Sequence, residues 1–390
     1  MGYAHDEDKI RRNAICNVSL QACPPCTRML AQQLKNMSTN KFLTEILEQP
    51  AAIGNIIHFY SAPEGMELLR KTREAIAQRN IHDVVFTGMG SSFFISFAAA
   101  SLFNQQGIHA HYINTSELLH YNLSLLNRPT LLVCASQSGE SYEIKEVLER
   151  LPQSVYCVGI VNEEDSALAR KADVALLCKG GREEMTSTKT YVLTSLAACI
   201  LGLYLSDRWN AHTQRQLAGL QAKFEDMLAS RNEWLGKGLD FLGDLTTLQI
   251  IARGPSFSTA SQSALMFKEA THIAATGILG GEFRHGPMEM VAPGFKSVLF
   301  ASEGRTLEQS LKMAEDIAGF GGRVWLITNS CDAVQHVTDN ILPVYVDEQD
   351  EYLFSILSIL PLQLFIDEYA KRHGFEAGSF SRGAKVTVTE

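Results

Sequence analysis

The spacing of hydrophobic residues along this chain changes from segment to segment. Between residues 41 and 80, apolar positions recur at the spacing of one face of an α-helix. Beyond residue 80, short apolar runs of strand length alternate with further helical stretches. Because strands that alternate with helices build a parallel sheet with helices on both faces, the pattern predicts an α/β fold.

Turn residues separate the runs and place the predicted strands. In the first half, strands are predicted at residues 82–87, 109–113, 129–134, 154–161 and 173–179. The order of strand, glycine turn and apolar helix returns at residue 247, with strands at 247–252, 296–302, 323–328 and 341–346 and one long helix at 353–373. The chain therefore predicts two tandem, doubly wound parallel-sheet domains.

The pattern divides the chain into five segments. They are an extension at residues 1–36, a first domain with its N-terminal helices at 37–206, a charged helical connector at 207–242, a second domain at 243–373 and a C-terminal tail at 374–390. The extension is polar and has no clear period, so we expect either a native start at Met37 or a loosely ordered segment.

Composition and charge narrow the class of protein. Hydrophobic residues make up 46% of the chain and charged residues 20%, as in globular proteins. The net charge of −9 disfavours nonspecific nucleic-acid binding. The longest apolar stretch, residues 191–205, is shorter than a membrane span and contains Thr194 and Ser195. We therefore expect no nucleic-acid or membrane partner.

Cysteine usage indicates a reducing compartment. Cys134, Cys157, Cys178 and Cys199 lie inside apolar runs and are predicted to be core residues. The Cys-Pro-Pro-Cys motif at residues 23–26 has no second pair or nearby histidine to complete a zinc site. With no recognisable signal peptide, the sequence predicts a cytoplasmic protein.

A serine-rich turn is the first candidate binding site. Residues 136–141 read Ser-Gln-Ser-Gly-Glu-Ser between a predicted strand and a predicted helix. The hydroxyls of Ser136, Ser138 and Ser141, with backbone N–H groups of the helix start, would make a neutral cradle for a phosphate. The alternative is that Ser138 and Ser141 only cap the helix, and the turn by itself leaves both interpretations open.

Two further polar segments also lie at the ends of predicted strands or helices. Residues 88–92 read Gly-Met-Gly-Ser-Ser after a predicted strand, and residues 186–190 read Thr-Ser-Thr-Lys-Thr before a predicted helix. Ligands of open parallel sheets bind beyond the carboxyl ends of the strands, so 88–92 and 136–141 are predicted to face one crevice. For 186–190 alone, helix capping is the favoured interpretation.

The second half carries candidate groups for acid–base chemistry. Glu269 lies near the end of an apolar helical stretch, where burial would raise the pKa of its carboxyl group. His285 lies on a glycine- and proline-rich loop, where an imidazole could exchange protons near pH 7. Spacing alone favours the alternative, a solvated glutamate and a loop histidine.

The same residues also fit a metal-binding pattern. Glu269 with His272, and Glu282 with His285, have the E-x-x-H spacing of di-iron bundles. Such a site needs both motifs inside long helices, whereas glycines and a proline surround His285. We therefore expect no metal here and no other cofactor.

Together these motifs resemble the SIS (sugar isomerase) family, especially the isomerase half of glucosamine-6-phosphate synthase, amino-sugar-phosphate deaminases and fructosamine-6-phosphate deglycases. The resemblance covers residues 37–390. Residues 88–92, 136–141 and 186–189 resemble its phosphate-binding segments. Glu269 and His285 have its spacing of base and ring-opening histidine, and Lys385 resembles the reactive lysine of the synthase.

The resemblance implies a role for each residue. The sugar phosphate would be held by Ser91, Ser92, Ser136, Gln137, Ser138 and Ser141, with Thr186 and Ser187 on the sugar hydroxyls or beside the phosphate. Glu269 would move a proton between C1 and C2. His285 would open the ring, reaching in from the partner subunit of a homodimer. Lys385 would assist ring opening or hold the open-chain carbonyl as an imine.

Departures from the synthase pattern bear on the reaction. No glutaminase domain with a cysteine at position 2 is recognised, so we expect no ammonia from glutamine. Met266 and Gln262 stand where the synthase has a lysine and an acid, and residues 281–294 look more like the deglycases, whereas Lys385 matches the synthase.

Three functions therefore stay open. The first is an isomerase-, deglycase- or deaminase-type enzyme that acts on an amino-linked sugar 6-phosphate by C1–C2 proton transfer. The second is a plain aldose–ketose phosphate isomerase. The third is a non-catalytic sugar-phosphate sensor. Because Glu269, His285 and Lys385 are all present and no DNA-binding module is recognised, the sequence favours an enzyme.

Overall fold

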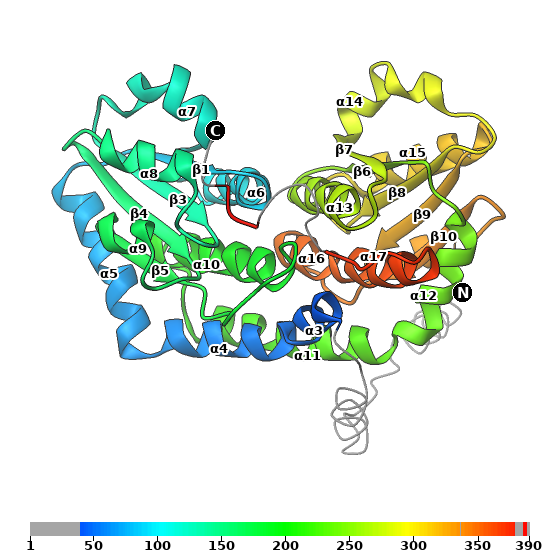
Figure 1. Ribbon diagram of the computed structural model, residues 1–390, viewed down its shortest axis with the longest axis horizontal. Helices are drawn as coiled ribbons and strands as arrows, with labels where there is room; N and C mark the ends of the chain where they lie inside the picture. The colour runs from blue at the N-terminus through cyan, green and yellow to red at the C-terminus, as the bar shows by residue number, and fades with distance from the viewer. Residues whose placement is uncertain (1–39, 336, 379–384, 388–390) are drawn as a thin grey trace, which may run out of the picture.

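Two parallel five-stranded sheets, each with helices around it, make up the computed structural model (Figure 1). The structure describes residues 40–335, 337–378 and 385–387. The predicted α/β fold of two tandem, doubly wound domains is confirmed. The predicted extension at 1–36, and with it the Cys-Pro-Pro-Cys motif, lies outside the described residues.

The helical pattern of residues 41–80 forms three helices, α3 (Lys41–Leu47), α4 (Gln49–Ser61) and α5 (Pro63–Gln78). The side chain of Asn40 accepts a hydrogen bond from the Leu43 N–H and so caps the first of them. Pro63 occupies the first turn of α5, where a missing N–H costs nothing, and it separates α5 from α4.

The first sheet has the strand order β2-β1-β3-β4-β5. Its strands are β1 (Asp83–Gly88), β2 (Ala110–Asn114), β3 (Thr130–Ser136), β4 (Val155–Val161) and β5 (Val174–Leu177). Helices α6 (Ser91–Gln105), α7 (Thr115–Tyr121), α8 (Tyr142–Glu149) and α9 (Ala167–Lys171) and the 3₁₀ turn η1 (Leu123–Leu126) connect them. Every residue of β3 and β4 is buried, as expected for central parallel strands.

The second sheet repeats this topology in the order β7-β6-β8-β9-β10. Its strands are β6 (Thr247–Ala252), β7 (Ala274–Leu279), β8 (Lys296–Ala301), β9 (Arg323–Thr328) and β10 (Ile341–Tyr345). Its helices are α13 (Ser256–Thr271), α14 (Gly280–Arg284) and α15 (Leu307–Gly319), with 3₁₀ turns η2 (Pro287–Met290) and η3 (Ala333–Gln335). The sequence pattern does not predict β7, an edge strand with only one fully buried residue.

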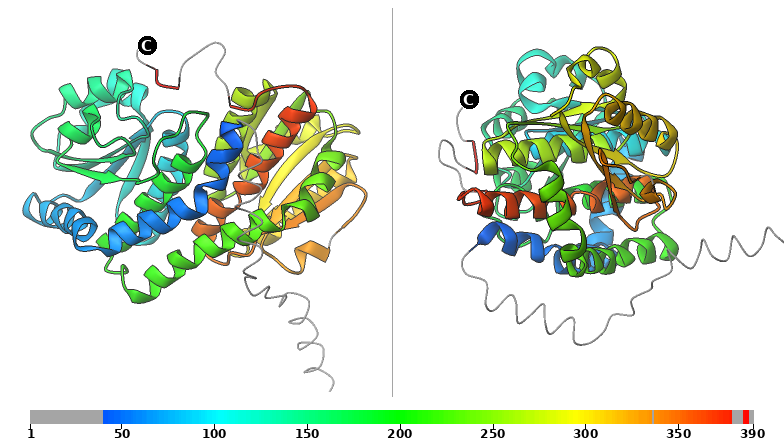
Figure 2. Two further views of the ribbon diagram at one scale, coloured as in Figure 1. Left: turned by 60° about the horizontal axis from the view of Figure 1, so that its bottom comes forward. Right: turned by 90° about the vertical axis from the view of Figure 1, so that its right-hand side faces the viewer.

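The two sheets share one hydrophobic core between them. Five further helices contribute buried side chains to this core: α10 (Lys189–Leu205), α11 (Ala211–Ala229), α12 (Arg231–Leu242), α16 (Glu351–Leu357) and α17 (Leu360–Arg372). Figure 2 shows α4 and α11 side by side beneath both halves. All four predicted core cysteines, in the strands, the loop after β5 and α10, are buried and free.

The long helix predicted at residues 353–373 is interrupted. Pro361 lies at the start of α17, where its ring prevents the preceding helix from continuing, so α16 and α17 are separate. Taken together, Glu351–Arg372 are long and apolar enough to cross a membrane, but 94% of the apolar window is buried inside the fold. The segment therefore fits the core helices of a folded domain.

Candidate active site

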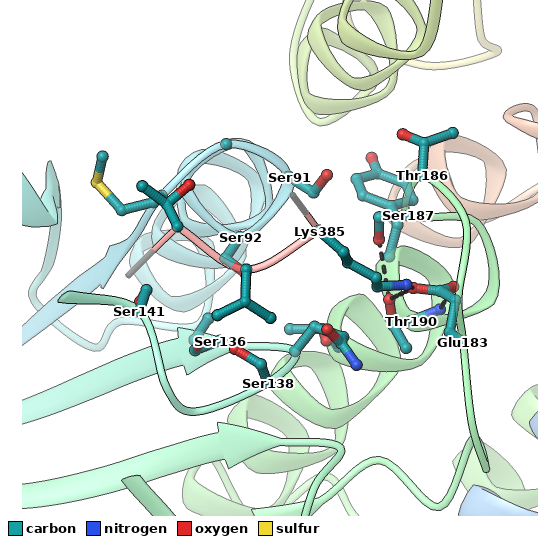
Figure 3. A pocket seen from close by; sticks show the side chains of 18 of the residues that line it. Ser91, Ser92, Ser136, Ser138, Ser141, Glu183, Thr186, Ser187, Thr190 and Lys385 are labelled. Carbon is teal, nitrogen blue, oxygen red and sulfur yellow. Dashed lines mark hydrogen bonds and ion pairs between the residues drawn. The ribbon is translucent and has the colours of Figure 1, made fainter. Parts of the chain in front are cut away.

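A cavity of about 250 Å³ opens at the carboxyl ends of β1 and β3, between the first sheet and α13 (Figure 3). Both halves and the C-terminal tail contribute to its wall. Ten of the eleven site residues predicted from the sequence line it: Ser91, Ser92, Ser136, Gln137, Ser138, Ser141, Thr186, Ser187, Glu269 and Lys385. Residues 88–92 and 136–141 thus face one crevice, as predicted.

The turn after β1 brings two serines to the cavity. Gly90 has a φ of +51°, a conformation that favours glycine, and Gly88 packs so closely that a Cβ there would lie 2.7 Å from the backbone of Ser92. This tight turn starts α6 directly at Ser91. The hydroxyl groups of Ser91 and Ser92 therefore stand at a helix N-terminus, where an anion is favoured.

The turn after β3 presents three more hydroxyl groups. The Oγ of Ser136 accepts a hydrogen bond from the Gly139 N–H at 3.1 Å, and the Oγ of Ser138 accepts one from the Glu140 N–H at 3.2 Å. Because both oxygens act as acceptors, their hydroxyl hydrogens can still be donated to a ligand. Ser141 is the N-cap residue of α8 but makes no side-chain capping bond. Ser138 thus satisfies a backbone N–H, as the capping alternative expects, whereas Ser141 does not, and both residues line the cavity.

The loop between β5 and α10 forms the opposite wall. The hydroxyl of Thr186 donates a hydrogen bond to Glu269, and the hydroxyls of Ser187 and Thr190 lie 2.9 Å apart. Glu183 accepts hydrogen bonds from the backbone N–H groups of Thr188 and Thr190 at 3.1 and 3.0 Å. Thr190 belongs to the polar segment predicted at residues 186–190, whereas Glu183, three residues before the Thr-Ser-Thr-Lys motif, was not predicted to be a site residue.

Glu269 lies in the last turn of α13 and faces the cavity from the second half. Burial raises the pKa of its carboxyl group, while the hydrogen bond from Thr186 and the charge of Lys385 lower the pKa to a smaller extent. The net direction is upward, as expected from the sequence. A carboxyl group with a raised pKa is a stronger base than an ordinary glutamate, which suits it to take up and return a proton.

Lys385 enters the cavity from the C-terminal tail. Its ammonium donates hydrogen bonds to the carboxylate of Glu183 at 2.9 Å and to the carbonyl of Met185 at 2.8 Å. The carbonyl of Thr387 accepts a hydrogen bond from the Tyr142 N–H at 3.2 Å, which ties the tail to the start of α8. Figure 3 shows the lysine side chain directed at Glu183 and away from Ser136, Ser138 and Ser141.

The charge of the cavity wall is negative overall. Among the described lining residues, Glu143, Glu183 and Glu269 are acidic and Lys385 is the one basic residue. Glu143 is only 4% exposed, and its Oε2 has no hydrogen-bond partner in the described part of the chain. The sequence analysis also missed this residue, because a glutamate in the first turn of a helix normally serves the helix dipole.

His285 is the predicted site residue that does not line the cavity. It follows the five-residue helix α14, which lies at the top of the second half in Figure 1, and it is exposed. The short helix also removes the geometry required for a di-iron bundle, since Glu282 and His285 do not lie in a long helix.

The described residues contain one cluster with metal-ligating side chains, at the edge of the first sheet. It consists of Asp83, His109 and His111, and the carboxylate of Asp83 is paired with Arg128 at 3.0 Å. None of the predicted site residues belongs to it. The expectation that the site works without a metal stays a prediction.

Comparisons with known proteins identify both halves. The family model described as SIS domain matches residues 78–202 and 243–368. A curated relative is the glutamine–fructose-6-phosphate aminotransferase (isomerizing) of Thermococcus kodakarensis, which is 26% identical over 357 residues. The match covers 89% of this chain and 58% of that enzyme, so this chain spans well under two thirds of the relative.

Solved structures share the fold. The C-terminal domain of glucosamine-fructose-6-phosphate aminotransferase from Francisella tularensis superposes with a TM-score of 0.79 at 22% identity, over 88% of this chain and 99% of that domain. Glucosamine-6-phosphate deaminase from Thermotoga maritima superposes with a TM-score of 0.67 at 19% identity, over 90% and 100% of the two chains.

Proposed function

This chain belongs to the SIS domain family, and we propose that it is an enzyme that moves a proton between C1 and C2 of an amino-linked sugar 6-phosphate. One observation carries the proposal: a hydroxyl-lined cradle, a buried carboxyl group with a raised pKa and a lysine ammonium face one small cavity. The curated relatives act on fructose 6-phosphate by name, which supports a sugar phosphate as the ligand.

The charge of the cavity supports an amine-bearing substrate. A phosphate needs donors, and the serines at the ends of β1 and β3 supply them without charge. The two carboxylates not paired with Lys385, Glu143 and Glu269, would instead favour a cationic nitrogen elsewhere on the substrate. An amino-linked sugar phosphate carries both charges, whereas a plain aldose or ketose phosphate carries only the anion.

The residues present can carry the proton transfer. In the open chain of a fructosyl amine 6-phosphate, C2 is a carbonyl and C1 bears the nitrogen; in glucosamine 6-phosphate C1 and C2 exchange these roles in every step that follows. Ionised Glu269 removes a proton from C1, the C–H electron pair forms a C1–C2 double bond, and the C2 oxygen takes up a proton. The ammonium of Lys385 faces the same cavity as a donor for that step.

Return of the proton completes the reaction. Glu269 gives its proton to C2 while the nitrogen lone pair forms a C1–N double bond, and the N–H proton of the resulting iminium returns to Lys385, which restores the ammonium. Water then splits this imine into a free amine and an aldose 6-phosphate. The same two proton transfers without a nitrogen would interconvert an aldose and a ketose, so the amine decides between deglycase or deaminase chemistry and simple isomerisation.

His285 is exposed, and we assign it to the active site of a second subunit. We place the ring-opening histidine in the cavity of the partner of a cytoplasmic homodimer, because in its own subunit it lies outside the cavity. An exposed imidazole that directly follows the short helix α14 of the second half is accessible to a second copy.

A panel of substrates tests the function. Purified protein is incubated with glucosamine 6-phosphate, fructose 6-phosphate and fructosyl-amino-acid 6-phosphates, and amine release and sugar interconversion are followed. We expect amine release from one of the nitrogen-bearing compounds. Interconversion of fructose 6-phosphate alone would identify a plain isomerase, and binding without turnover would identify a sensor.

The variant Glu269→Gln tests the catalytic assignment. Loss of the ionisable group should abolish turnover while binding of the substrate persists, because the phosphate cradle is untouched. Lys268→Gln is the matched control, since Lys268 is the exposed neighbour on the same helix. Unchanged turnover in Glu269→Gln would remove this residue from the proton-transfer role.

A further inference from the structure

Glu183 is a buried acidic residue in the wall of the cavity. The residue is 4% exposed, and its side chain is fully buried. An ionised carboxylate at such a place is costly unless several donors satisfy both oxygens. Glu183 has such donors on each oxygen, and the two sets belong to different parts of the site.

One oxygen of Glu183 organises the start of α10. Its Oε1 accepts hydrogen bonds from the backbone N–H groups of Thr188 and Thr190. Thr188 is the N-cap residue of α10, but its own side chain makes no capping bond to the helix. The carboxylate therefore replaces the missing cap and also stabilises the positive end of the helix dipole.

The other oxygen holds the lysine. Oε2 accepts hydrogen bonds from the Lys385 ammonium at 2.9 Å and from the Thr190 hydroxyl at 2.5 Å. The lysine side chain is only 20% exposed, so solvent screens this pair weakly. With the carbonyl of Met185 as its second acceptor, the ammonium is held in one place at the cavity wall.

The same loop reaches the proposed base. Thr186, which lies between Glu183 and the start of α10, donates a hydrogen bond to Glu269. The Nε2 of Gln262 on α13 donates to the carbonyl of Ser187 at 2.9 Å. A displacement of this loop would therefore change the position of Glu269 relative to the ammonium that Glu183 holds.

We propose that Glu183 is a positioning residue for the reaction, which fixes the Lys385 ammonium and the loop of residues 186–190 relative to Glu269. The inference rests on the proposed function for its consequence in turnover, but not for the arrangement itself. Glu183 does not touch the reacting carbons in this assignment; it acts through the lysine and the loop.

The variant Glu183→Gln separates positioning from folding. A glutamine that keeps its oxygen on the N–H groups of Thr188 and Thr190 turns its NH₂ group towards Lys385, where two donors face each other. Helix α10 keeps its cap and the ammonium loses its charged partner. We expect kcat to fall about tenfold or more, as for a lost charge-assisted bond, with little change in substrate Kd.

Glu184→Gln is the matched control. Its side chain is 33% exposed and pairs with Lys41 and Arg182 at the surface, one residue from Glu183. We expect its kcat to stay within about twofold of the native value, because exposed ion pairs contribute little. A kcat of Glu183→Gln that matches this control would overturn the proposal.

A double variant distinguishes positioning from a general structural role. If Glu183 acts through Lys385, adding Glu183→Gln to Lys385→Met should lower kcat by less than about twofold further. If Glu183 supports the fold independently, the two losses multiply. Multiplied losses would therefore overturn the assignment.

Chemical labelling provides a measurement that needs no substrate. Native protein and both glutamine variants are treated with acetic anhydride, and mass spectrometry gives acetylation of Lys385 relative to the exposed Lys237. Release of the ammonium should raise this ratio severalfold in Glu183→Gln and leave it unchanged in Glu184→Gln. A raised ratio in a protein that turns over no sugar phosphate would refute the proposed function and retain the arrangement. An unchanged ratio would refute the arrangement.

Discussion

The carboxyl group of Glu269 determines the pH range of the proposed reaction. Burial raises its pKa, so it takes up a proton at a higher pH than an ordinary glutamate. A base must be ionised, so kcat/KM should fall as the pH falls through this raised pKa. The pH dependence of kcat/KM measures this pKa.

The variant Thr186→Val removes a hydrogen bond that lowers the pKa of Glu269, so the pH at which kcat/KM falls should move upward. An acid limb at the pH of an ordinary glutamate would contradict the assignment.

The same pKa has a consequence for stability. In the unfolded chain Glu269 loses its proton at lower pH than in the folded protein, so between the two pKa values the folded state binds more protons. The stability that this proton provides is present below the unfolded pKa and is lost as the pH rises through the folded pKa. Glu269→Gln should therefore have a higher Tm than the native protein at pH 8, with the difference shrinking towards pH 4. Equal Tm values at pH 8 would show that the carboxyl group carries no burial cost.

The hydroxyl of Ser138 is expected to recognise the phosphate alone. Its oxygen accepts the Glu140 N–H, so its hydrogen can be donated to a ligand in the cavity. Ser138→Ala should weaken binding of a sugar phosphate by about tenfold, the value of one bond to a charged group, and leave the free sugar unaffected. Calorimetry with both ligands measures this, with the exposed Ser124→Ala as control. Equal losses for both ligands would refute the cradle.

The turn between β3 and α8 depends on a glycine. Gly139 has a φ of +63°, and a Cβ there would lie 2.2 Å from the Oγ of Ser166. Gly181 has nearly the same φ, +64°, with open space around it. Gly181→Ala should cost only the conformational penalty of roughly 1 kcal/mol, whereas Gly139→Ala should cost more and also weaken phosphate binding, because the turn carrying Ser138 must move.

Thermal unfolding and phosphate binding of the two alanine variants test this turn. Both replace a glycine of positive φ, so the difference between them isolates the contact with Ser166. Indistinguishable variants would mean that the turn accommodates the methyl group by a small shift and that the backbone there is not tightly specified.

The two halves contribute different groups to the cavity. The first sheet carries the hydroxyl cradle at the ends of β1 and β3, while Glu269 comes from α13 of the second half. Neither half therefore contains the site alone, although both have the same strand order. The two domains repeat one topology, yet they form a single site at their boundary to which each contributes different residues.

Shared sites in a homodimer predict complementation. Glu269→Gln and His285→Ala are each expected to be inactive. In a mixed dimer, the subunit that retains Glu269 receives the intact histidine from its partner, so one of two sites works. Random exchange of equal amounts should restore about a quarter of native activity. Refolding the two variants together and measuring turnover tests this. No recovery in a mixture shown to contain mixed dimers would place His285 outside the partner's site.

The sequence by itself determined the α/β class, the two repeated domains and the polar segments at the strand ends, because these depend on local pattern. Apolar runs specify buried strands, and serines beside glycines at strand ends mark turns that could either bind an anion or cap the next helix. Edge strand β7 escaped prediction because half-exposed residues leave no clear period, and the break before α17 depended on a single proline.

Only the tertiary structure shows which carboxylate is buried in the site and which one pairs with cations at the surface. Glu183 and Glu184 are adjacent and chemically identical, yet one is buried between Lys385 and α10 and the other pairs with surface cations. Lys385 and Lys41 lie far away along the chain, and the local pair of Glu184 with Arg182 is at the surface, so no local pattern shows which glutamate is buried. Burial and charge pairing are properties of the folded neighbourhood, and the chemistry of the cavity depends on both.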